Sequence, residues 1–131
     1  MKNSMLKLVS CFFIGFIILS GCASSKLSDD FAEDDVKKAT EEVISYINNE
    51  DSEAILEMSN AEMKDALTDE VLQEVYSSIN ESGKFEKIED ISISGKEEIA
   101  IAVAKTKYEN NEIIYTISFN KEMKIAGLFY K

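Results

Sequence analysis

His, Arg, Pro and Trp are all absent from this sequence of 131 residues, and each of its 14 basic side chains is a Lys. The absence of His excludes Ser-His-Asp triads, Cys-His pairs and His-based zinc sites. The absence of Arg excludes bidentate clamping of a phosphate or carboxylate. The 25 acidic residues give a formal net charge of −11, which provides no attraction to nucleic acid. We therefore predict no nucleic-acid partner.

The start of the chain has the features of a secretory signal peptide. Lys2 and Lys7 provide a basic start without any acid, and residues 8–19 form an uncharged, apolar run. As a helix this run would measure about 18 Å, which is short of the ~30 Å hydrocarbon core of a bilayer. Such a run, followed by small residues, indicates a removable signal peptide and not a permanent membrane span.

The residues after this run, Leu19-Ser20-Gly21-Cys22, resemble the lipobox of bacterial lipoproteins. The resemblance implies that residues 1–21 are removed and that Cys22 carries thioether-linked diacylglycerol. The protein would then be anchored through membrane lipid at the cell membrane, facing outside the cytoplasm, because two acyl chains (palmitate is a common one) give durable attachment. The alternatives are an uncleaved N-terminal anchor, or an ordinary signal peptide followed by a chance Cys. Cys11 would leave with the signal peptide, so the mature chain has no partner for a disulfide.

The mature chain is predicted to have a lipidated Cys and tether over residues 22–30 and a single domain over residues 31–131. An amphipathic helix is expected from Asp29 to about Asn49, with Ser28 or Asp29 as its N-cap and acids in its first turn. The apolar residues of this segment recur at steps of three and four, which is typical of a helix with one buried face: Val36, Ala39, Val43 and Ile47.

Two further helices and one short turn are expected before the strands. The second helix is predicted over residues 51–58, and Ser59-Asn60-Ala61-Glu62 has the form of a capping box that opens a short turn. Thr68 is expected to cap a third main helix, and Gly83 follows it where a left-handed C-terminal cap is common. Residues 29–90 hold 20 acids and 5 Lys, so the helical half carries nearly all of the negative charge.

After Gly83 the apolar pattern changes from a helical period to alternation. Four strands are predicted, over residues 85–93, 99–108, 113–119 and 124–130. The turns are expected at residues 94–96, 109–111 and 120–123, and such short turns favour an antiparallel meander. Helices followed by strands predict an α+β fold, with three N-terminal helices packed on one face of a four-stranded antiparallel sheet.

Several segments resemble a bacterial family known as domain of unknown function 3887. The closing segment from Phe119 to Phe129, with its KIAGLF ending, is the most specific, and Tyr76 stands where members often have Trp. The other matching segments are Met63-Lys64, Leu67-Thr68, Leu72, Val75-Tyr76, Gly83-Lys84-Phe85 and Ile88. The resemblance covers roughly residues 35–131. It implies the cystatin-like α+β fold of the nuclear transport factor two-like superfamily, with a curved sheet, and it supplies no catalytic residues. That superfamily includes enzymes, ligand binders and dimerisation modules, so the fold does not decide the function.

The Met and aromatic residues of the predicted elements suggest a ligand pocket between the helices and the sheet. These candidate pocket residues are Met58, Met63, Tyr76, Phe85, Tyr115 and Phe119. The alternative is ordinary core packing, because a domain of this size needs most of its apolar side chains inside. The hydroxyls of Tyr76, Tyr108 and Tyr115 could orient a ligand, or they could simply reach water at the edge of the core.

Acidic residues are the only abundant catalytic type, and they occur mainly as adjacent pairs such as Asp34-Asp35 and Glu97-Glu98. Adjacent residues on a helix point about 100° apart, so such a pair rarely converges on one substrate. The acidic segments also lack the spacing and turn Gly of a calcium-binding loop. We therefore predict no catalytic residue, no metal site and no cofactor.

The second predicted strand has two apolar faces. Ala100, Ala102 and Ala104 lie on one face, and Ile99, Ile101 and Val103 on the other. Since helices can cover only one face, the other could be covered by a second copy of the chain. The leading hypothesis is a non-catalytic lipoprotein domain that binds a small ligand or an envelope protein through the concave face of the sheet. The alternatives are a carboxylate-dependent isomerase or hydrolase with a Tyr donor, and a purely dimerising accessory module.

Overall fold

The computed structural model describes residues 26–131; the predicted signal peptide and Cys22 lie outside the described residues. Within this range the chain forms four helices, α2 (Glu33–Asn48), α3 (Ser52–Met58), α4 (Ala61–Ala66) and α5 (Asp69–Asn80). Four strands follow, β1 (Phe85–Lys96), β2 (Ile99–Tyr108), β3 (Glu112–Phe119) and β4 (Ile125–Tyr130). The α+β prediction is confirmed, but the described residues contain four helices and not three, because α4 is a helix in its own right.

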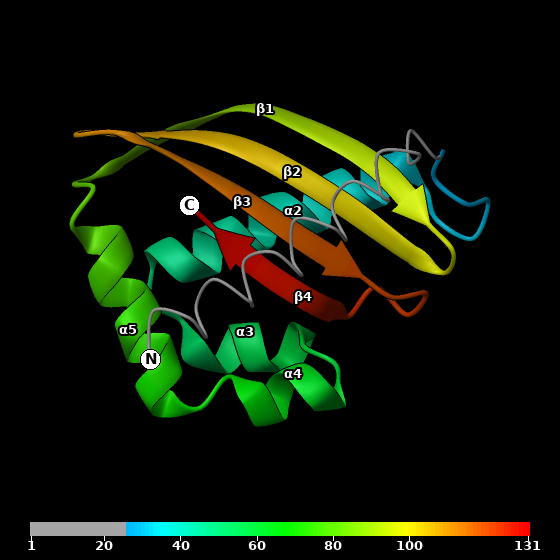
Figure 1. The fold of residues 1–131 in the computed structure, drawn as a ribbon, viewed down its shortest axis with the longest axis horizontal. Helices are drawn as coiled ribbons and strands as arrows, with labels where there is room; N and C mark the ends of the chain where they lie inside the picture. Colours follow the sequence, from blue (N-terminus) through cyan, green and yellow to red (C-terminus); the bar gives the residue numbers. More distant parts are fainter. Residues whose placement is uncertain (1–25) are drawn as a thin grey trace, which may run out of the picture.

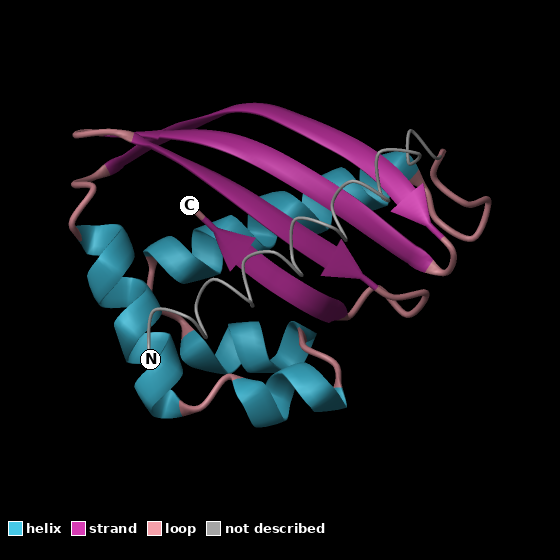
Figure 2. Ribbon diagram, viewed as in Figure 1, coloured by secondary structure: helices cyan, strands magenta, loops and turns pink. Residues whose placement is uncertain are grey.

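The four strands form one antiparallel sheet in the order β1-β2-β3-β4. Figure 1 and Figure 2 show the strands curving over the helices, with α2 running behind the sheet and α3 and α4 below β4. Helix α2 contacts β1 and β2, and α4 contacts β4. The helices thus lie together on one side of the sheet, which is where the apolar core forms.

The alternating pattern of the strands decides which side chains enter that core. Ala100, Ala102 and Ala104 of β2 are fully buried, and their small size lets α2 lie close to the sheet. From the helix side, Val36 and Val43 are also completely buried. Burial of a Val or Ile side chain stabilises a fold by roughly 1.5–3 kcal/mol, so this layer is the main source of stability.

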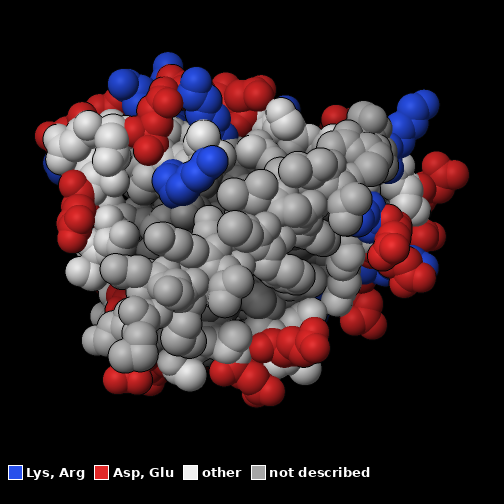
Figure 3. Space-filling model, in the orientation of Figure 1, with Lys and Arg blue, Asp and Glu red and all other residues white. Residues whose placement is uncertain are grey.

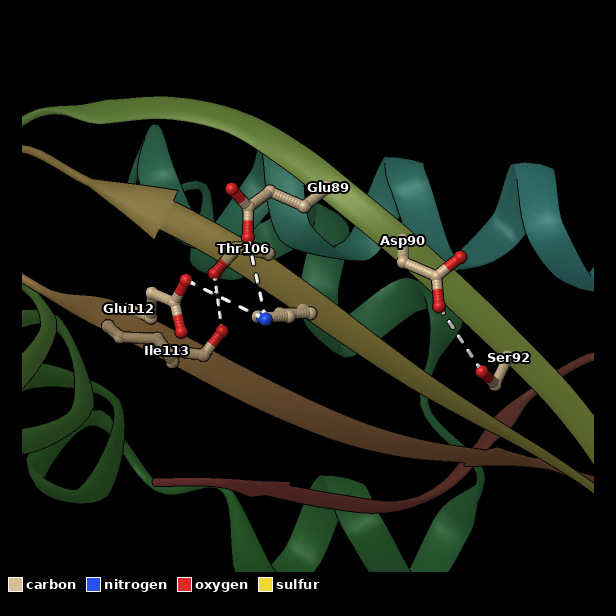
Figure 4. A network of polar contacts seen from close by, with 7 residues as sticks. Glu89, Asp90, Ser92, Thr106, Glu112 and Ile113 are labelled. Carbon is tan, nitrogen blue, oxygen red and sulfur yellow. Dashed lines mark hydrogen bonds and ion pairs between the residues drawn. The ribbon is translucent and has the colours of Figure 1, made fainter.

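The opposite, outer face of the sheet carries a mixture of apolar and charged side chains. Val103 is 38% exposed and Phe129 is 67% exposed. Lys105 lies two residues further along β2 than Val103. Its ammonium group is 4.0 Å from a carboxylate oxygen of Glu89 and 3.8 Å from a carboxylate oxygen of Glu112, in the polar network drawn in Figure 4. These ion pairs are exposed and contribute little to stability.

The first helix begins four residues later than predicted. Ala32 is its N-cap and makes no side-chain cap hydrogen bond. Ser28 instead forms a separate turn, in which its carbonyl accepts from the Phe31 amide (3.0 Å) and its hydroxyl accepts from the Asp30 amide (3.1 Å). Phe31 is buried, so this turn anchors the chain on the core before the helix starts.

The prediction that Ser59 caps the next helix is also wrong. Asn60 is the N-cap of α4, and its side-chain oxygen accepts from the Met63 amide at 2.8 Å. The Ser59 hydroxyl donates instead to the Ile55 carbonyl at the end of α3. The predicted Thr68 cap is confirmed, because its hydroxyl oxygen accepts from the Val71 amide.

Strand β1 is three residues longer than predicted. Lys96 pairs with Ile99, so the turn consists of Glu97-Glu98 and not of residues 94–96. Glu97 has a φ of 56°, which is the left-handed conformation that so tight a turn requires. Gly95 therefore lies inside the strand, where a Cβ would come within 2.8 Å of the Leu27 Cα atom. The absence of a side chain at Gly95 lets residues 26–28 lie directly against the end of β1.

Gly83 joins α5 to the sheet in the left-handed conformation that the sequence predicts, with a φ of 87°. A Cβ at this position would lie 2.7 Å from the Glu109 Cβ atom. The close approach arises because the segment pairs with the β2–β3 turn, where the Asn110 amide donates to the Ser82 carbonyl and the Glu109 amide to the Lys84 carbonyl. Gly83 is therefore required both for its backbone angle and for its lack of a side chain.

We predict that Gly83→Ala destabilises the fold by about 2–3 kcal/mol, because left-handed strain and a steric clash add together. Gly127→Ala is the matched control, since a Cβ there meets Ser118 only at ordinary contact distance, and it should change stability by less than about 0.5 kcal/mol. Urea unfolding followed by circular dichroism measures both variants. Equal losses for the two variants would contradict the assignment of strain to Gly83.

Candidate functional site

The six candidate pocket residues lie in different environments and do not line one common cavity. Tyr115 and Phe119 point into the core from β3 and are fully buried, and Tyr76 is 3% exposed on α5. Met63 is half-buried on α4 and packs against the core. Met58 and Phe85 line two separate hollows, Met58 next to Met123 and Phe85 next to Tyr108. In the part of the chain that the structure describes, core side chains thus fill the concave face of the sheet.

The hollow beside Phe85 is a polar cleft of about 550 Å³, which we call the amide cleft. Its lining residues belong to the C-terminal ends of α2 and α5, the start of β1, the end of β2 and the turns next to them. Figure 1 shows these element ends together on the left of the view. Amide and aromatic side chains dominate its lining, which consists of Asn48, Asn49, Asn80, Gly83, Lys84, Phe85, Tyr108 and Glu109.

A second hollow of about 340 Å³ adjoins the amide cleft and shares Asn80 with it. Its lining is also polar, with Glu50, Gln73, Tyr76, Ser77, Asn80 and Glu81. The Asn80 amide donates to a Glu50 carboxylate oxygen at 3.0 Å, and the Tyr76 hydroxyl hydrogen-bonds the Ser52 hydroxyl at 2.8 Å. These bonds tie α3, α5 and the turn after α2 together, so the walls of both hollows are held by regular elements.

A chain of hydrogen bonds runs from the core to the wall of the amide cleft. The Tyr108 hydroxyl donates to Asn48 Oδ1 at 2.6 Å and lies 2.7 Å from the Tyr115 hydroxyl. A phenol has one proton to donate, so the Tyr108 oxygen must accept the proton of Tyr115. The order of donation is therefore Tyr115 to Tyr108 to Asn48.

The Asn48 amide nitrogen at the end of this chain is buried and has no hydrogen-bond partner among the described residues. Leaving such a donor unmet costs about 1–3 kcal/mol, so buried polar groups are nearly always paired. Asn48 itself lines the amide cleft. An acceptor bound in the cleft would therefore lie next to the side chain that carries this donor.

Both phenols of the chain stay protonated at ordinary pH. Burial raises the pKa of Tyr108, and the hydrogen bond that its oxygen accepts from Tyr115 offsets part of that effect. Burial also raises the pKa of Tyr115, and its hydrogen bond to Tyr108 acts in the same direction. The pair consequently works as fixed, neutral hydrogen-bond donors and acceptors at neutral pH.

Every Asp and Glu of the sequence is exposed, including Glu50, Glu81 and Glu109, which line the two hollows. Figure 3 shows acidic side chains along the lower edge of the molecule, where Figure 1 places α3 and α4. In residues 26–131 no group of three or more His, Cys, Asp or Glu is placed to hold a metal ion. None of the helices in this range is long and apolar enough to cross a membrane.

Sequence reasoning identified Tyr108 and Tyr115 as hydroxyls of interest but missed Asn48 as their partner. From the sequence alone, Asn48-Asn49 indicates only the end of the helix that is predicted over residues 29–49. Asn48 and Tyr108 are 60 positions apart, and their contact depends on how α2 crosses the sheet. No local signal in the sequence could have found it.

Comparison with known proteins identifies one family. Residues 40–128 match the family described as "Protein of unknown function (DUF3887)". A protein from Ruminococcus gnavus ATCC 29149, solved by NMR, is similar in structure with a TM-score of 0.69 at 17% sequence identity, over 80% of this chain and 96% of that one. At this identity the likeness shows the fold alone. None of the curated proteins matches the chain.

We predict that Tyr108→Phe costs more stability than Tyr115→Phe. The Tyr108 change leaves both Asn48 Oδ1 and the Tyr115 hydroxyl unpaired, at about 2–4 kcal/mol, whereas the Tyr115 change removes one donor, at about 1–2 kcal/mol. Denaturant unfolding of the two variants and of the double variant measures these costs and their coupling. Additive costs with no coupling would contradict the hydrogen-bond chain.

Stability should also fall as the pH rises through about 10, the ordinary pKa of Tyr. Above this pH the unfolded chain loses the protons of Tyr108 and Tyr115 that the folded chain retains, so each of these two phenols lowers the unfolding free energy by about 1.4 kcal/mol per pH unit. Unfolding curves between pH 8 and 11 should show a shallower fall for Tyr115→Phe than for the Tyr46→Phe control, whose residue lies outside the chain of hydrogen bonds. Identical slopes would contradict the raised pKa of Tyr115.

Proposed function

The chain belongs to the DUF3887 family, whose description assigns no activity, and we propose that it is a lipid-anchored, extracytoplasmic module that binds a ligand or partner in the amide cleft without transforming it. The observation that carries this proposal is the unpartnered Asn48 donor at the end of a neutral hydrogen-bond chain. A folded protein gains nothing from an unmet buried donor, whereas a binding site gains affinity and specificity from one.

Three Glu residues line the two hollows, but every Asp and Glu, these three included, is exposed, which supports binding over catalysis. A carboxylate that transfers protons to or from a substrate is usually enclosed in a pocket, away from bulk water. The two phenols of the cleft are held protonated, which suits a group that orients a ligand more than one that exchanges protons at neutral pH. These features weigh against the alternative of a carboxylate-dependent isomerase or hydrolase.

The lipid anchor is supported by the basic start, the short apolar run and the lipobox-like Leu19-Ser20-Gly21-Cys22. The four residue steps from Cys22 to Lys26 reach at most about 14 Å. Leu27 lies against Gly95 at the far end of β1, about 33 Å along the strand from Phe85 in the amide cleft. A lipid on Cys22 would therefore hold the opposite end of the domain near the membrane and leave the cleft facing outward.

We expect Cys22→Ala to abolish lipid attachment, because the thioether forms on that sulfur. Labelling with radioactive palmitate in a bacterial host, followed by separation of membranes from soluble material, measures attachment and location. Cys11→Ala is the matched control and should keep both the label and the membrane location. Labelling of Cys22→Ala at the level of the unchanged protein would refute the anchor.

A second candidate function, dimerisation through the outer face of the sheet, is favoured by one feature of the surface. Val103 and Phe129 are exposed on that face. Residues 91–131 hold 5 acids and 6 Lys and are nearly neutral, whereas residues 29–90 hold 20 acids and 5 Lys. Two copies repel each other through their helices, so the nearly neutral sheet is the face on which they can approach.

Sedimentation equilibrium on the processed chain carrying Cys22→Ser tests this association. A dimer through the sheet predicts a concentration-dependent mass that Phe129→Glu abolishes, because the change buries a charge in the interface. Val71→Glu, at an exposed position on α5, is the control and should leave the mass unchanged. A monomeric mass at all concentrations would exclude the dimer.

A further inference from the structure

We propose that the ligand of the amide cleft is a neutral, hydroxyl-rich molecule, namely a short saccharide or the end of a glycan chain; this inference rests on the proposed function of the cleft. The two adjoining hollows, of about 550 and 340 Å³, fall in the range of small-molecule sites. Their charge, their hydrogen-bonding groups and their aromatic surface select among the classes of ligand that fit this space.

The charges around the cleft disfavour an anion. Glu50, Glu81 and Glu109 line the two hollows, and Lys84 is the single cation among the lining residues. The sequence contains no Arg with which to form the bidentate contacts that usually hold a phosphate or carboxylate. An anionic ligand would therefore meet a site of net negative charge without the groups that compensate for it.

The hydrogen-bond pattern disfavours a simple organic cation. The unmet group in the wall is the Asn48 amide nitrogen, a donor, and an ammonium group has no acceptor to offer it. A hydroxyl group both donates and accepts, so one ligand can accept from Asn48 and donate to Glu109 or Glu50. The many amide groups of the lining, from Asn49, Asn80 and Gln73, likewise suit a ligand with donors and acceptors on the same atoms.

Phe85, the more exposed of the two aromatic residues of the cleft, adds an apolar surface next to these polar groups. Phe85 is 38% exposed, and its ring meets the Tyr108 ring edge to face, with centroids 5.4 Å apart at 71°. This contact with a buried ring holds Phe85 in place, so that it can offer a fixed face to a ligand. A sugar ring has hydroxyls around its edge and C–H groups on its faces, which fits an aromatic surface bordered by amides and carboxylates.

Amide chemical-shift mapping on the ¹⁵N-labelled processed chain with Cys22→Ser tests the ligand class. The probes are chitotriose, maltotriose and cellotriose, together with spermidine as a cation, glycerol phosphate as an anion and blocked tetra-alanine as a neutral peptide. We expect at least one saccharide to shift the amides of Asn48, Asn80, Phe85 and Glu109, whereas the other three probes do not.

Two exposed aromatic residues provide matched variants that should both fold. Phe85→Ser should weaken saccharide binding at least tenfold, and Phe129→Ser, on the outer face, should leave the affinity unchanged. Glu109→Gln should weaken binding about three- to tenfold by removing a charged acceptor.

The results separate the two proposals. Shifts of the cleft amides by spermidine, glycerol phosphate or the peptide, with none by the saccharides, would overturn the ligand class and leave the cleft as a binding site. The absence of any shift of the cleft amides, or equal effects of Phe85→Ser and Phe129→Ser on saccharide affinity, would overturn both the saccharide ligand and the binding function of the cleft.

Discussion

The chain of hydrogen bonds from Tyr115 through Tyr108 to Asn48 connects the interior of this domain to its surface. Two buried phenols can share a short contact only if one donates to the other and the second finds an acceptor, which here is the Asn48 side chain. That requirement fixes the C-terminal end of α2 over the ends of β2 and β3. Among residues 26–131 the amide nitrogen of Asn48 is left without a partner, and Asn48 lines the polar cleft.

The distribution of charge and the position of the cleft complement each other. The acidic side chains lie exposed on the surface, 20 of the 25 within residues 29–90, and an anionic membrane would repel them. Residues 26–28, where the described part of the chain begins, lie against Gly95 near the end of β1. The amide cleft lies at the opposite end of this strand, beside Phe85. An anchored domain built in this way would present its binding groups away from the lipid, where a water-soluble or cell-wall ligand can reach them.

The amino-acid sequence was sufficient to predict the α+β class, the order of the elements and the family, because these depend on local periodicity and on segments such as the Phe119–Phe129 ending. The sequence was insufficient to predict where the helices begin. Ser28 and Ser59 are both good cap residues, but burial of Phe31 and the hydrogen bond of Ser59 to Ile55 gave them other roles. The candidate site was even harder to predict from the sequence, because Asn48 and Tyr108 meet only after α2 has packed on the sheet.

The side-chain amide resonance of Asn48 gives the most direct test of this account, since it reports on the one donor from which the binding site is inferred. The resonance can be assigned by its loss in Asn48→Asp and followed in the free protein and during addition of a neutral saccharide. We predict an amide without the signature of a hydrogen bond in the free protein. Its resonance should move downfield, and its protons should exchange more slowly, when the saccharide is added. An amide that is already hydrogen-bonded in the free protein, or one that does not respond to any ligand, would contradict this prediction.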